Sequence, residues 1–496
     1  MDDNCCVPSQ ASLRPAVWRV LCERWPQILA TCALILTPCF WHREIVSADL
    51  GSHLYNAWLV ELIRRGQAPG LWIAPLRTNV LFDLLLSRVG SVLGWGASEK
   101  IVVSIAVLIF FWGIFALVSA AARRPPWFLV PLIALVTYGW TFHLGLFNYY
   151  LSLGLSFFSL AILWRATGWE RWIALAIAPL VLVAHPLGFF WLLGAGAYIW
   201  IHENTGQRVH VLLFALAVAA IGALHFFLFR HYPVDAAAKP FYAFNGADQL
   251  VLFGERYRIV ARAVLIFAVV SLAIDLIARR REHKPTSHYS LPLQLYLLTE
   301  VAIVFLPDAV AFPPPTAAVA LLTERLTSVS AAMACCLLGA MRPRKWHLVA
   351  CGAIAAVFFS LLYRDTSIVN KMESQIMALV SELPPNQRVM ATIFPPSGSR
   401  VLIQHLIDRA CIGRCFSYGN YEPGAALFRV RALPGNPYVL SDYGLAVKTE
   451  KGDYLVQPRD LPVYQIYQCT ADETDLCIRS LEAGEENDRL GKHPNR

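Results

Sequence analysis

Long apolar runs alternate with short polar segments from Pro26 to Tyr363. A transmembrane helix needs about 20 predominantly apolar residues, so runs near that length predict such helices. The predicted spans are 26–42, 100–121, 127–143, 150–165, 172–184, 187–201, 209–230, 259–278, 291–306, 324–341 and 346–363. Beyond Tyr363 the chain is polar, rich in proline and glycine, and has no spanning run. The pattern predicts an α-helical polytopic membrane protein with about eleven transmembrane helices, followed by one soluble domain.

Segment 79–94 is also apolar, but we expect it to lie on the membrane surface. If it crossed the membrane, Arg123 and Arg124 would lie outside, against the preference of arginine for the cytoplasmic side. On the surface, it leaves them inside with Arg279–Arg281 and the basic run 342–345. The predicted parts are a cytoplasmic tail (1–25), a transmembrane domain (26–363) with an outer loop (43–99), and an extracytoplasmic domain (364–496).

One alternative would reverse the later spans. Residues 172–184 are short for a full crossing, so 172–201 could form a single helix kinked at Pro186. The triplet Arg279–Arg281 would then lie outside, which favours two separate spans that meet at His185–Pro186.

The composition agrees with a membrane protein and excludes several other classes. Hydrophobic residues make up 57% of the chain and charged residues 15%, against about 25% charged residues in globular domains. The net charge of +8 is explained by loop arginines and lysines, and no long basic run with interleaved aromatic residues indicates a nucleic-acid partner. The run from Pro26 to Trp41 lacks a signal-cleavage site and predicts an anchor. No phosphate-binding glycine loop, GxSxG or HExxH motif is present.

The stretch "SADLGSHLYNAWLVELIRRG" after the first span predicts an amphipathic helix. Its polar side chains fall within an arc of roughly 100° at helical spacing, and they are Asp49, Ser52, His53 and Asn56. The opposite side carries Leu50, Leu54, Tyr55, Trp58 and Leu62. We expect this helix to lie in the membrane interface, with Leu54 and Trp58 in lipid and the polar side in water.

This arrangement resembles the GT-C superfamily of polytopic glycosyltransferases, which take sugars from polyprenyl-phosphate carriers. The similar features are a first span, an outer loop with Asp49 just past that span, a second surface segment ("TNVLFDLLLSRVGSVLGWG"), and several short spans after it. The resemblance is architectural and covers roughly residues 25 to 230. Members often carry two acidic residues in the first outer loop. Here Asp49 is followed by Leu50, and Glu44 is the nearest other acid.

The resemblance implies a reaction on the outer face. The donor would be a polyprenyl-phosphate-linked sugar, the acceptor a glycan, lipid or protein, and Asp49 the base that activates the acceptor. A divalent cation could assist the leaving phosphate. Asp49 could instead cap the helix together with Ser47. His53 could orient Asp49, share a metal with it, contact phosphate, or have no role.

Further candidate residues lie at or within later spans. Arg256, Arg258 and Arg325 lie at the outer ends of spans, where they could bind a lipid-linked phosphate or extend to the headgroups. Arg325 follows Glu324, which suggests an ion pair. Glu300 lies within a span, so we expect it to face a cavity at a substrate site or to be paired as a structural residue.

The C-terminal domain is expected to be α/β. A helix is predicted near 368–383, followed by the strand-like runs "RVMATIF", "ALFRVRAL", "DYLVQ" and "VYQIYQC". Four cysteines in this domain would face an oxidising compartment and are predicted to form disulfides: Cys411, Cys415, Cys469 and Cys477. Cys411–Cys415 is the simplest pairing among three connectivities. No histidine accompanies these cysteines at ligand spacing, so no metal site is predicted.

Together these features predict a glycosyltransferase of the inner (plasma) membrane that works at its outer face among membrane lipids. The alternative is a non-catalytic transporter or assembly factor for envelope polysaccharide. A transporter would be expected to show internal repeats and charged groups near the membrane midplane.

Overall fold

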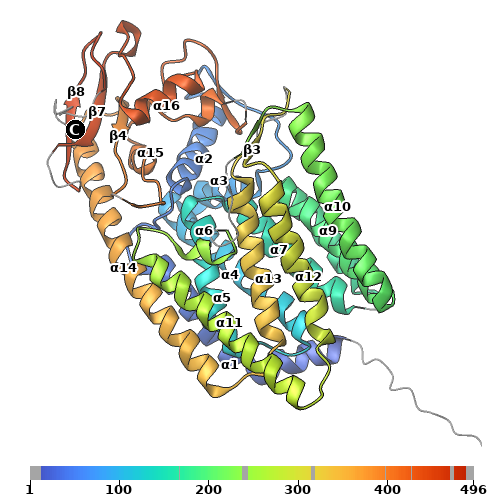
Figure 1. Cartoon of the computed structure of the whole chain (residues 1–496). Helices are drawn as coiled ribbons and strands as arrows, with labels where there is room; N and C mark the ends of the chain where they lie inside the picture. Colours follow the sequence, from blue (N-terminus) through green and yellow to red (C-terminus); the bar gives the residue numbers. More distant parts are fainter. Residues whose placement is uncertain are drawn as a thin grey trace, which may run out of the picture.

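The computed structural model describes residues 13–166, 168–236, 244–313, 319–396, 398–425, 427–469 and 474–487, with side chains from residue 24 onward. Most of this chain forms a body of packed helices, which we call the helical body (Figure 1). Its helices are α1 (Leu13–Phe40), α4 (Trp95–Ala122), α5 (Val130–Thr137), α6 (Trp140–Leu144), α7 (Phe147–Arg165), α8 (Arg171–Ala184), α9 (Pro186–Glu203), α10 (Gln207–His231), α11 (Tyr257–Arg281), α12 (Ser290–Phe305), α13 (Leu322–Ala340) and α14 (Lys345–Glu382). The first twelve residues of the predicted cytoplasmic tail lie outside the described residues.

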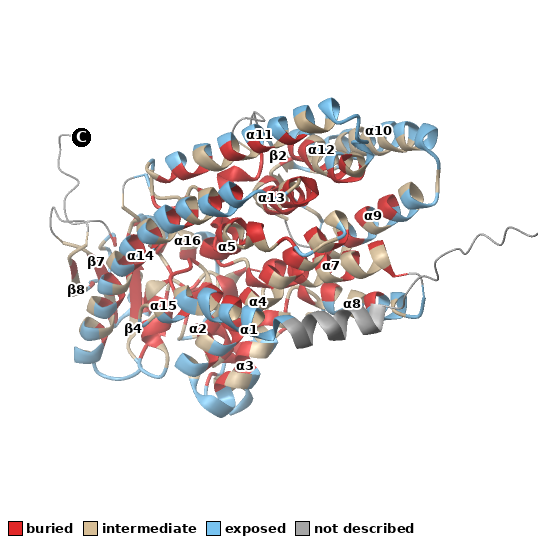
Figure 2. Ribbon diagram, turned by 90° about the horizontal axis from the view of Figure 1, so that it is seen from below, coloured by how far each residue is buried: buried red, intermediate tan, exposed pale blue. Residues whose placement is uncertain are grey.

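The helices indicate a membrane-embedded protein. Six helical stretches of the described chain are long and apolar enough to cross a membrane. Only 6% of the apolar window of α10 is buried, against 61% of the window of α4. Large apolar side chains on the outer helices therefore face away from the protein, among them Trp172, Phe226 and Ile266, as the exposed colours of α10 and α11 show (Figure 2). Such a surface suits lipid, because hydrocarbon has no penalty for apolar side chains.

The expected break at His185–Pro186 is confirmed, whereas the membrane-surface location of segment 79–94 stays a prediction. The chain between 172 and 201 is two helices, α8 and α9, which meet at His185–Pro186. His185 caps α9, because its Nδ1 accepts a hydrogen bond from the Leu187 amide at 3.1 Å. Segment 79–94 forms the short helix α3 (Leu81–Leu93), which has 13 residues and buries Phe82 and Leu86 on one side. A helix of this length is shorter than a full crossing.

The predicted boundary at Tyr363 falls inside a helix. Helix α14 continues without a break through 38 residues to Glu382, so the last predicted span and the predicted helix 368–383 are one element. The stretch contains no proline, and Leu362, Val369 and Ile376 continue a buried face at helical spacing. Packing thus extends the helix beyond the apolar run that marks the span.

The segment after α14, residues 383–487, is called the C-terminal segment. It contains a sheet of four strands in the order β5 (Phe416–Ser417), β4 (Arg388–Thr392), β7 (Val463–Gln468) and β8 (Leu476–Ser480). Strand β4 runs parallel to β5 and β7, and β8 is antiparallel to β7. Two helices accompany the sheet, α15 (Leu406–Cys411) and α16 (Tyr443–Lys451). The run "DYLVQ" forms no strand and makes only an isolated bridge between Leu455 and Glu486.

The C-terminal segment packs directly onto the loop between α1 and α4. Strand β6 (Val430–Ala432), from the run "ALFRVRAL", pairs with β1 (Leu71–Ile73) of that loop. Helix α2 (Leu50–Arg64) lies beside α15 (Figure 1), and the Ser417 amide donates to the Tyr55 hydroxyl at 3.0 Å. The expectation that α2 faces lipid is therefore wrong: Leu54 is 1% exposed because the C-terminal segment and neighbouring helices cover it.

Candidate functional site

The start of α2 is fixed to the turn between α6 and α7. The amides of Ala48 and Asp49 donate to the carbonyls of His143 and Leu144, at 2.8 and 3.2 Å. Gly145 makes this contact possible. It adopts a φ of +90°, and a Cβ at this position would lie 2.7 Å from the Asp49 nitrogen. Other residues are strained at such a φ, so glycine allows the close approach of the two segments.

Asp49 lies at this junction, and its carboxylate makes no hydrogen bond to the described residues. It occupies the N-cap position of α2 but makes no capping hydrogen bond, and Ser47 instead donates its hydroxyl to the Phe142 carbonyl at 2.8 Å. The pair therefore forms no capping hydrogen bond, while Asp49 still lies at the N-terminus of α2, where a carboxylate interacts favourably with the helix dipole. The Asp49 side chain is 24% exposed. Burial raises its pKa, while the charges of His405, His53 and Arg325 act to lower it.

His405 of the C-terminal segment faces Asp49. Its Nε2 lies 4.0 Å from the Asp49 Oδ1, and its Nδ1 is hydrogen-bonded to the Asp408 Oδ2 at 2.9 Å. Burial alone would lower the pKa of His405, but Asp408 and Asp49 outweigh it and raise the pKa to about 9. The Nε2 atom is buried and has no hydrogen-bond partner in the described chain. His405 therefore presents an imidazolium N–H toward Asp49.

Arg325 approaches the same place from the start of α13. Its Nη1 lies 2.8 Å from the Nε2 of His185, and its guanidinium stacks over Tyr149 at 5.6 Å from the ring centre. The predicted pairing with Glu324 is wrong, because the described side chains place His185 and Tyr149 around the guanidinium. The Arg325 Nε is buried without a hydrogen-bond partner among the described residues. A buried donor of this kind costs free energy unless a ligand or water accepts from it.

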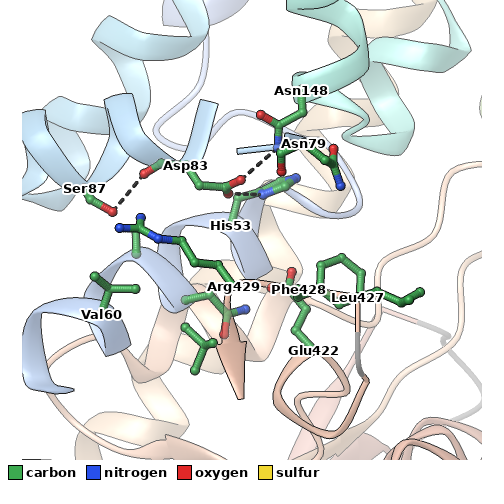
Figure 3. Close-up of a pocket in the computed structure, with 13 residues that line it drawn as sticks. His53, Val60, Asn79, Asp83, Ser87, Asn148, Glu422, Leu427, Phe428 and Arg429 are labelled. Carbon is green, nitrogen blue, oxygen red and sulfur yellow. Dashed lines mark hydrogen bonds and ion pairs between the residues drawn. The ribbon is translucent and has the colours of Figure 1, made fainter. Parts of the chain in front are cut away.

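His53 is paired with Asp83 of α3, not with Asp49 (Figure 3). Its Nδ1 lies 2.6 Å from the Asp83 Oδ1, and its Nε2 lies 3.2 Å from the Gly145 carbonyl oxygen. Both partners are acceptors, so both ring nitrogens carry hydrogen and the ring is an imidazolium. Burial alone lowers the pKa of His53, but Asp83 raises it to about 9. With both nitrogens occupied, His53 has no lone pair for a metal or for a base.

A pocket opens beside this ion pair (Figure 3). Its polar lining comes from α2, α3, α7 and the C-terminal segment, and includes His53, Asp83, Asn148, Glu422 and Arg429. The Asn148 amide donates to the Asp83 Oδ2 at 2.8 Å. Burial raises the pKa of Glu422 to about 7, and one buried nitrogen of Arg429 has no partner in the described chain. The C-terminal segment therefore offers the pocket both a donor and a titratable carboxyl.

The other predicted site residues lie apart from Asp49. Arg256 forms an ion pair with Asp365, and Arg258 pairs with Glu255 on the surface. One carboxylate oxygen of Glu300 of α12 accepts a hydrogen bond from Ser330, and the other is buried without a partner in the described chain. No described contact joins Arg256, Arg258 or Glu300 to Asp49. The structure thus brings Arg325 and His53 to Asp49 and leaves these three elsewhere.

The four cysteines form two disulfides, Cys411–Cys415 and Cys469–Cys477, each with an S–S distance of 2.03 Å. The first follows α15 directly, so it lies close in sequence to His405 and Asp408. The described residues contain no group of three histidine, cysteine, aspartate or glutamate side chains that could hold a metal ion.

The arrangement has the groups for proton transfer and anion binding. A partly exposed carboxylate can accept a proton from a hydroxyl, and a guanidinium with a free donor can bind phosphate. Comparison with known proteins found no match: no family model, no curated protein and no solved structure matches this chain.

Proposed function

We propose that this protein is a membrane glycosyltransferase that transfers a sugar from a polyprenyl-phosphate carrier to a glycan, lipid or protein acceptor. One observation carries the proposal: Asp49 and Arg325 interact electrostatically, and each keeps an unused hydrogen-bonding atom. The Asp49 side chain is also 24% exposed, so a substrate can reach it. The unused atoms of Asp49 and Arg325 remain available to an acceptor hydroxyl and to a donor phosphate.

In the proposed reaction, the acceptor oxygen forms a bond with the anomeric carbon of the sugar while the bond from that carbon to the phosphate oxygen breaks. The hydroxyl proton passes to the Asp49 carboxylate, and polyprenyl phosphate leaves with the bonding electrons. Arg325 stabilises the charge that develops on the phosphate. His405 acts as a positioning residue, because its imidazolium holds Asp49 in the ionised form.

The proposal places Asp49 and the C-terminal segment on the outer face of the inner (plasma) membrane and the N-terminus in the cytoplasm. The arginines at the far ends of the helices support this orientation, because Arg123, Arg124, Arg279 and Arg342 line one common pocket there. A cytoplasm-dependent reporter fused after Glu382 should be silent. Since α14 is continuous, a fusion at Tyr363 would cut the helix and is a poor test.

The function is tested by incubating purified protein with lipids extracted from host membranes and measuring released polyprenyl phosphate by mass spectrometry. We expect release with the parent protein and a loss of about 10–100-fold with Arg325→Gln, because a hydrogen bond to a charged group contributes about 1.5–3 kcal/mol. Arg258→Gln is the matched control, since that side chain is 54% exposed and pairs only with Glu255 in the described chain. Absence of release with every lipid fraction would favour a transporter or assembly factor. Adding EDTA to the same assay tests for a divalent cation.

A further inference from the structure

A basic pocket lies between the ends of α4, α11 and α13, far from Asp49. Helix α4 carries Glu99 close to the C-terminal segment and ends at Ala122, about 35 Å further along its axis. The pocket, together with the solvent at its mouth, has a volume of about 540 Å³. Its lining is Ala121, Ala122, Arg123, Arg124, Arg279, His288, Ala340 and Arg342. Apart from three alanines, every lining residue is basic.

The neighbouring carboxylates do not neutralise this pocket. Asp275 lies 2.5 Å from the Nε of Arg279 and also accepts from the Arg342 amide. Glu282 pairs with Arg342 at 2.6 Å in a half-exposed ion pair. Arg124 binds only main-chain carbonyls in the described chain, those of Gly339 and Met341. Four guanidinium groups therefore face two carboxylates, and neither carboxylate lines the pocket.

Two further features indicate that the pocket binds a ligand. Arg123 follows the last residue of α4 and adopts a φ of +55°, where glycine is preferred. An arginine in this backbone conformation has a conformational cost. The Nε2 of His288 is buried at the pocket wall without a partner in the described chain. An anion in the pocket would accept from His288 and screen the arginines from one another.

We propose that this pocket binds a phosphate-bearing anion, and that its occupant is the headgroup of an anionic phospholipid. Guanidinium groups bind phosphate oxygens through paired donors, and basic pockets between transmembrane helices suit anionic headgroups. The small side chains of Ala121, Ala122 and Ala340 leave space between the arginines for such a group. The site is independent of the proposed transfer reaction.

Native mass spectrometry of the detergent-purified protein tests the proposal with phosphatidylglycerol, phosphatidylcholine and inorganic phosphate as separate probes. The pocket variant is Arg123→Gln with Arg342→Gln. The control variant is Arg280→Gln with Arg281→Gln, which removes two charges from the same end of the molecule without touching the pocket lining. Both variants keep Arg279 and Arg124, which bond to the helix ends.

We expect the parent and the control to retain phosphatidylglycerol over phosphatidylcholine, and the pocket variant to retain at least about 10-fold less, from two lost charge-assisted contacts. Equal phosphatidylglycerol binding by the pocket variant and the control would overturn the proposal. If inorganic phosphate binds as well as phosphatidylglycerol and depends on the same arginines, the pocket binds phosphate but the lipid assignment is wrong. If both variants lose phosphatidylglycerol to the same extent, the binding depends on the overall positive charge at this end of the protein. That result would also overturn the proposed site.

Discussion

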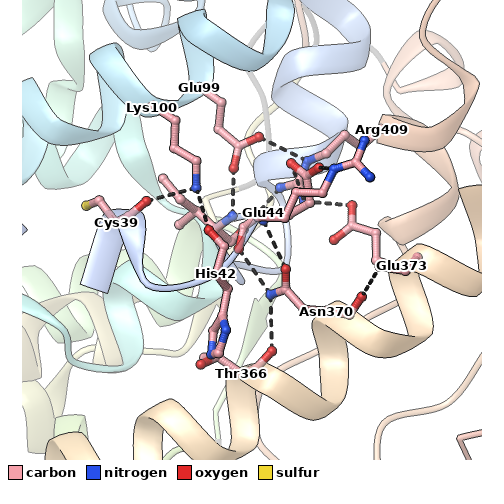
Figure 4. A network of polar contacts seen from close by, with 12 residues as sticks. Cys39, His42, Glu44, Glu99, Lys100, Thr366, Asn370, Glu373 and Arg409 are labelled. Atoms are coloured by element: carbon pink, nitrogen blue, oxygen red, sulfur yellow. Dashed lines mark hydrogen bonds and ion pairs between the residues drawn. The ribbon is translucent and has the colours of Figure 1, made fainter. Parts of the chain in front are cut away.

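Two clusters of charged side chains join the helical body to the C-terminal segment, and they differ in how closely their groups are paired and how far they are exposed. The first, called the Arg409 cluster, contains Arg409, Glu44, Glu99 and Glu373 (Figure 4). The second, called the Asp49 cluster, contains Asp49, Arg325 and His405. In the first, Arg409 has two buried carboxylates within 3.3 Å, whereas in the second Asp49 is partly exposed and lies 4.0 Å from His405.

The Arg409 cluster ties four parts of the chain together. Arg409 of α15 bonds to Glu373 of α14 at 2.6 Å and lies 3.3 Å from Glu99 of α4. The Glu99 carboxylate also accepts from the Ile45 amide at 2.8 Å. The side chains of Arg409, Glu99 and Glu373 are only 7%, 1% and 1% exposed. A ligand has no access to such groups, so we assign this cluster to structure.

The difference between the clusters teaches that a buried charge alone does not mark a functional site. Both clusters pair an arginine with carboxylates at the same interface. Both clusters contain buried atoms without a hydrogen-bond partner in the described chain: the Nε of Arg409 and one Oε of Glu373 in the first, the Nε of Arg325 and the Nε2 of His405 in the second. What distinguishes the Asp49 cluster is access, because the Asp49 side chain is 24% exposed. Native structures leave few such groups, so each one calls for an explanation.

The largest expected effect comes from breaking the Arg409 cluster. Arg409→Leu leaves three carboxylates close together in a buried site, and removing one partner of a buried ion pair costs about 3–5 kcal/mol. We expect the variant to accumulate poorly and to unfold at a lower temperature. Arg414→Leu, at an exposed position of the same segment, should behave like the parent in both measurements. Normal stability of Arg409→Leu would contradict the structural assignment.

A smaller effect should follow from separating His405 from Asp49. A methyl group on Gly51 of α2 would lie 2.4 Å from the His405 carbonyl oxygen, so α15 must move away. Overpacking of this kind costs about 1–3 kcal/mol, and we expect Gly51→Ala to lower transfer more than it lowers protein abundance.

Gly96→Ala provides the control, because this glycine of α4 has open space within 4 Å of the added methyl. It should keep full transfer and gain slightly in stability, since alanine favours the helix. If both variants retain full transfer, the contact between α2 and α15 does not position the site.

The sequence predicted the helical character and the break at His185–Pro186, because each depends on local patterns of apolar residues, prolines and charge. Asp49 became a candidate through the family resemblance, and Arg325 through its place at the end of a predicted span. The prediction missed Asp83, which appears as a single carboxylate in an apolar run, and its pairing with His53 depends on tertiary contacts. A lone charge on the apolar face of a short helix was the available signal.

His405 and Asp408 could not be inferred from local sequence. They lie at the start of a six-residue helix, more than 350 positions after Asp49, and only the packing of the C-terminal segment on α2 brings them to the site. The same packing explains why the lipid-facing interpretation of Leu54 failed. Periodicity shows which side of a helix is apolar, but it does not show whether lipid or protein covers that side.

The smallest predicted effect is a dependence of the unfolding temperature on pH, which comes from His53 and His405 and not from Arg409. His53 and His405 have pKa values of about 9 in the folded protein, above the ordinary value of 6.5. The folded state therefore binds more protons between these values, so this contribution is fully present below about pH 6.5 and is lost as the pH rises through about 9. We expect the unfolding temperature to fall across that window.

The variant Asp83→Asn tests whether the His53 ion pair causes this pH dependence. Without the Asp83 charge, the pKa of His53 should fall and the decline of the unfolding temperature should become shallower. Arg409 remains charged throughout, and its cluster is the same in both proteins, so its contribution cancels in the comparison. Identical slopes in the parent and in Asp83→Asn would show that the His53 pair does not control the effect.

The central claim is tested most directly by Asp49→Asn, measured for both folding and chemistry. Asparagine keeps the size of the side chain, and Asp49 makes no capping hydrogen bond that could be lost. We expect normal abundance, an unfolding temperature close to that of the parent, and a decrease in polyprenyl-phosphate release of about 10²–10⁴-fold, the range typical of a lost general base. Full release by a normally folded Asp49→Asn protein would contradict the account and assign the Asp49 cluster, like the Arg409 cluster, to structure.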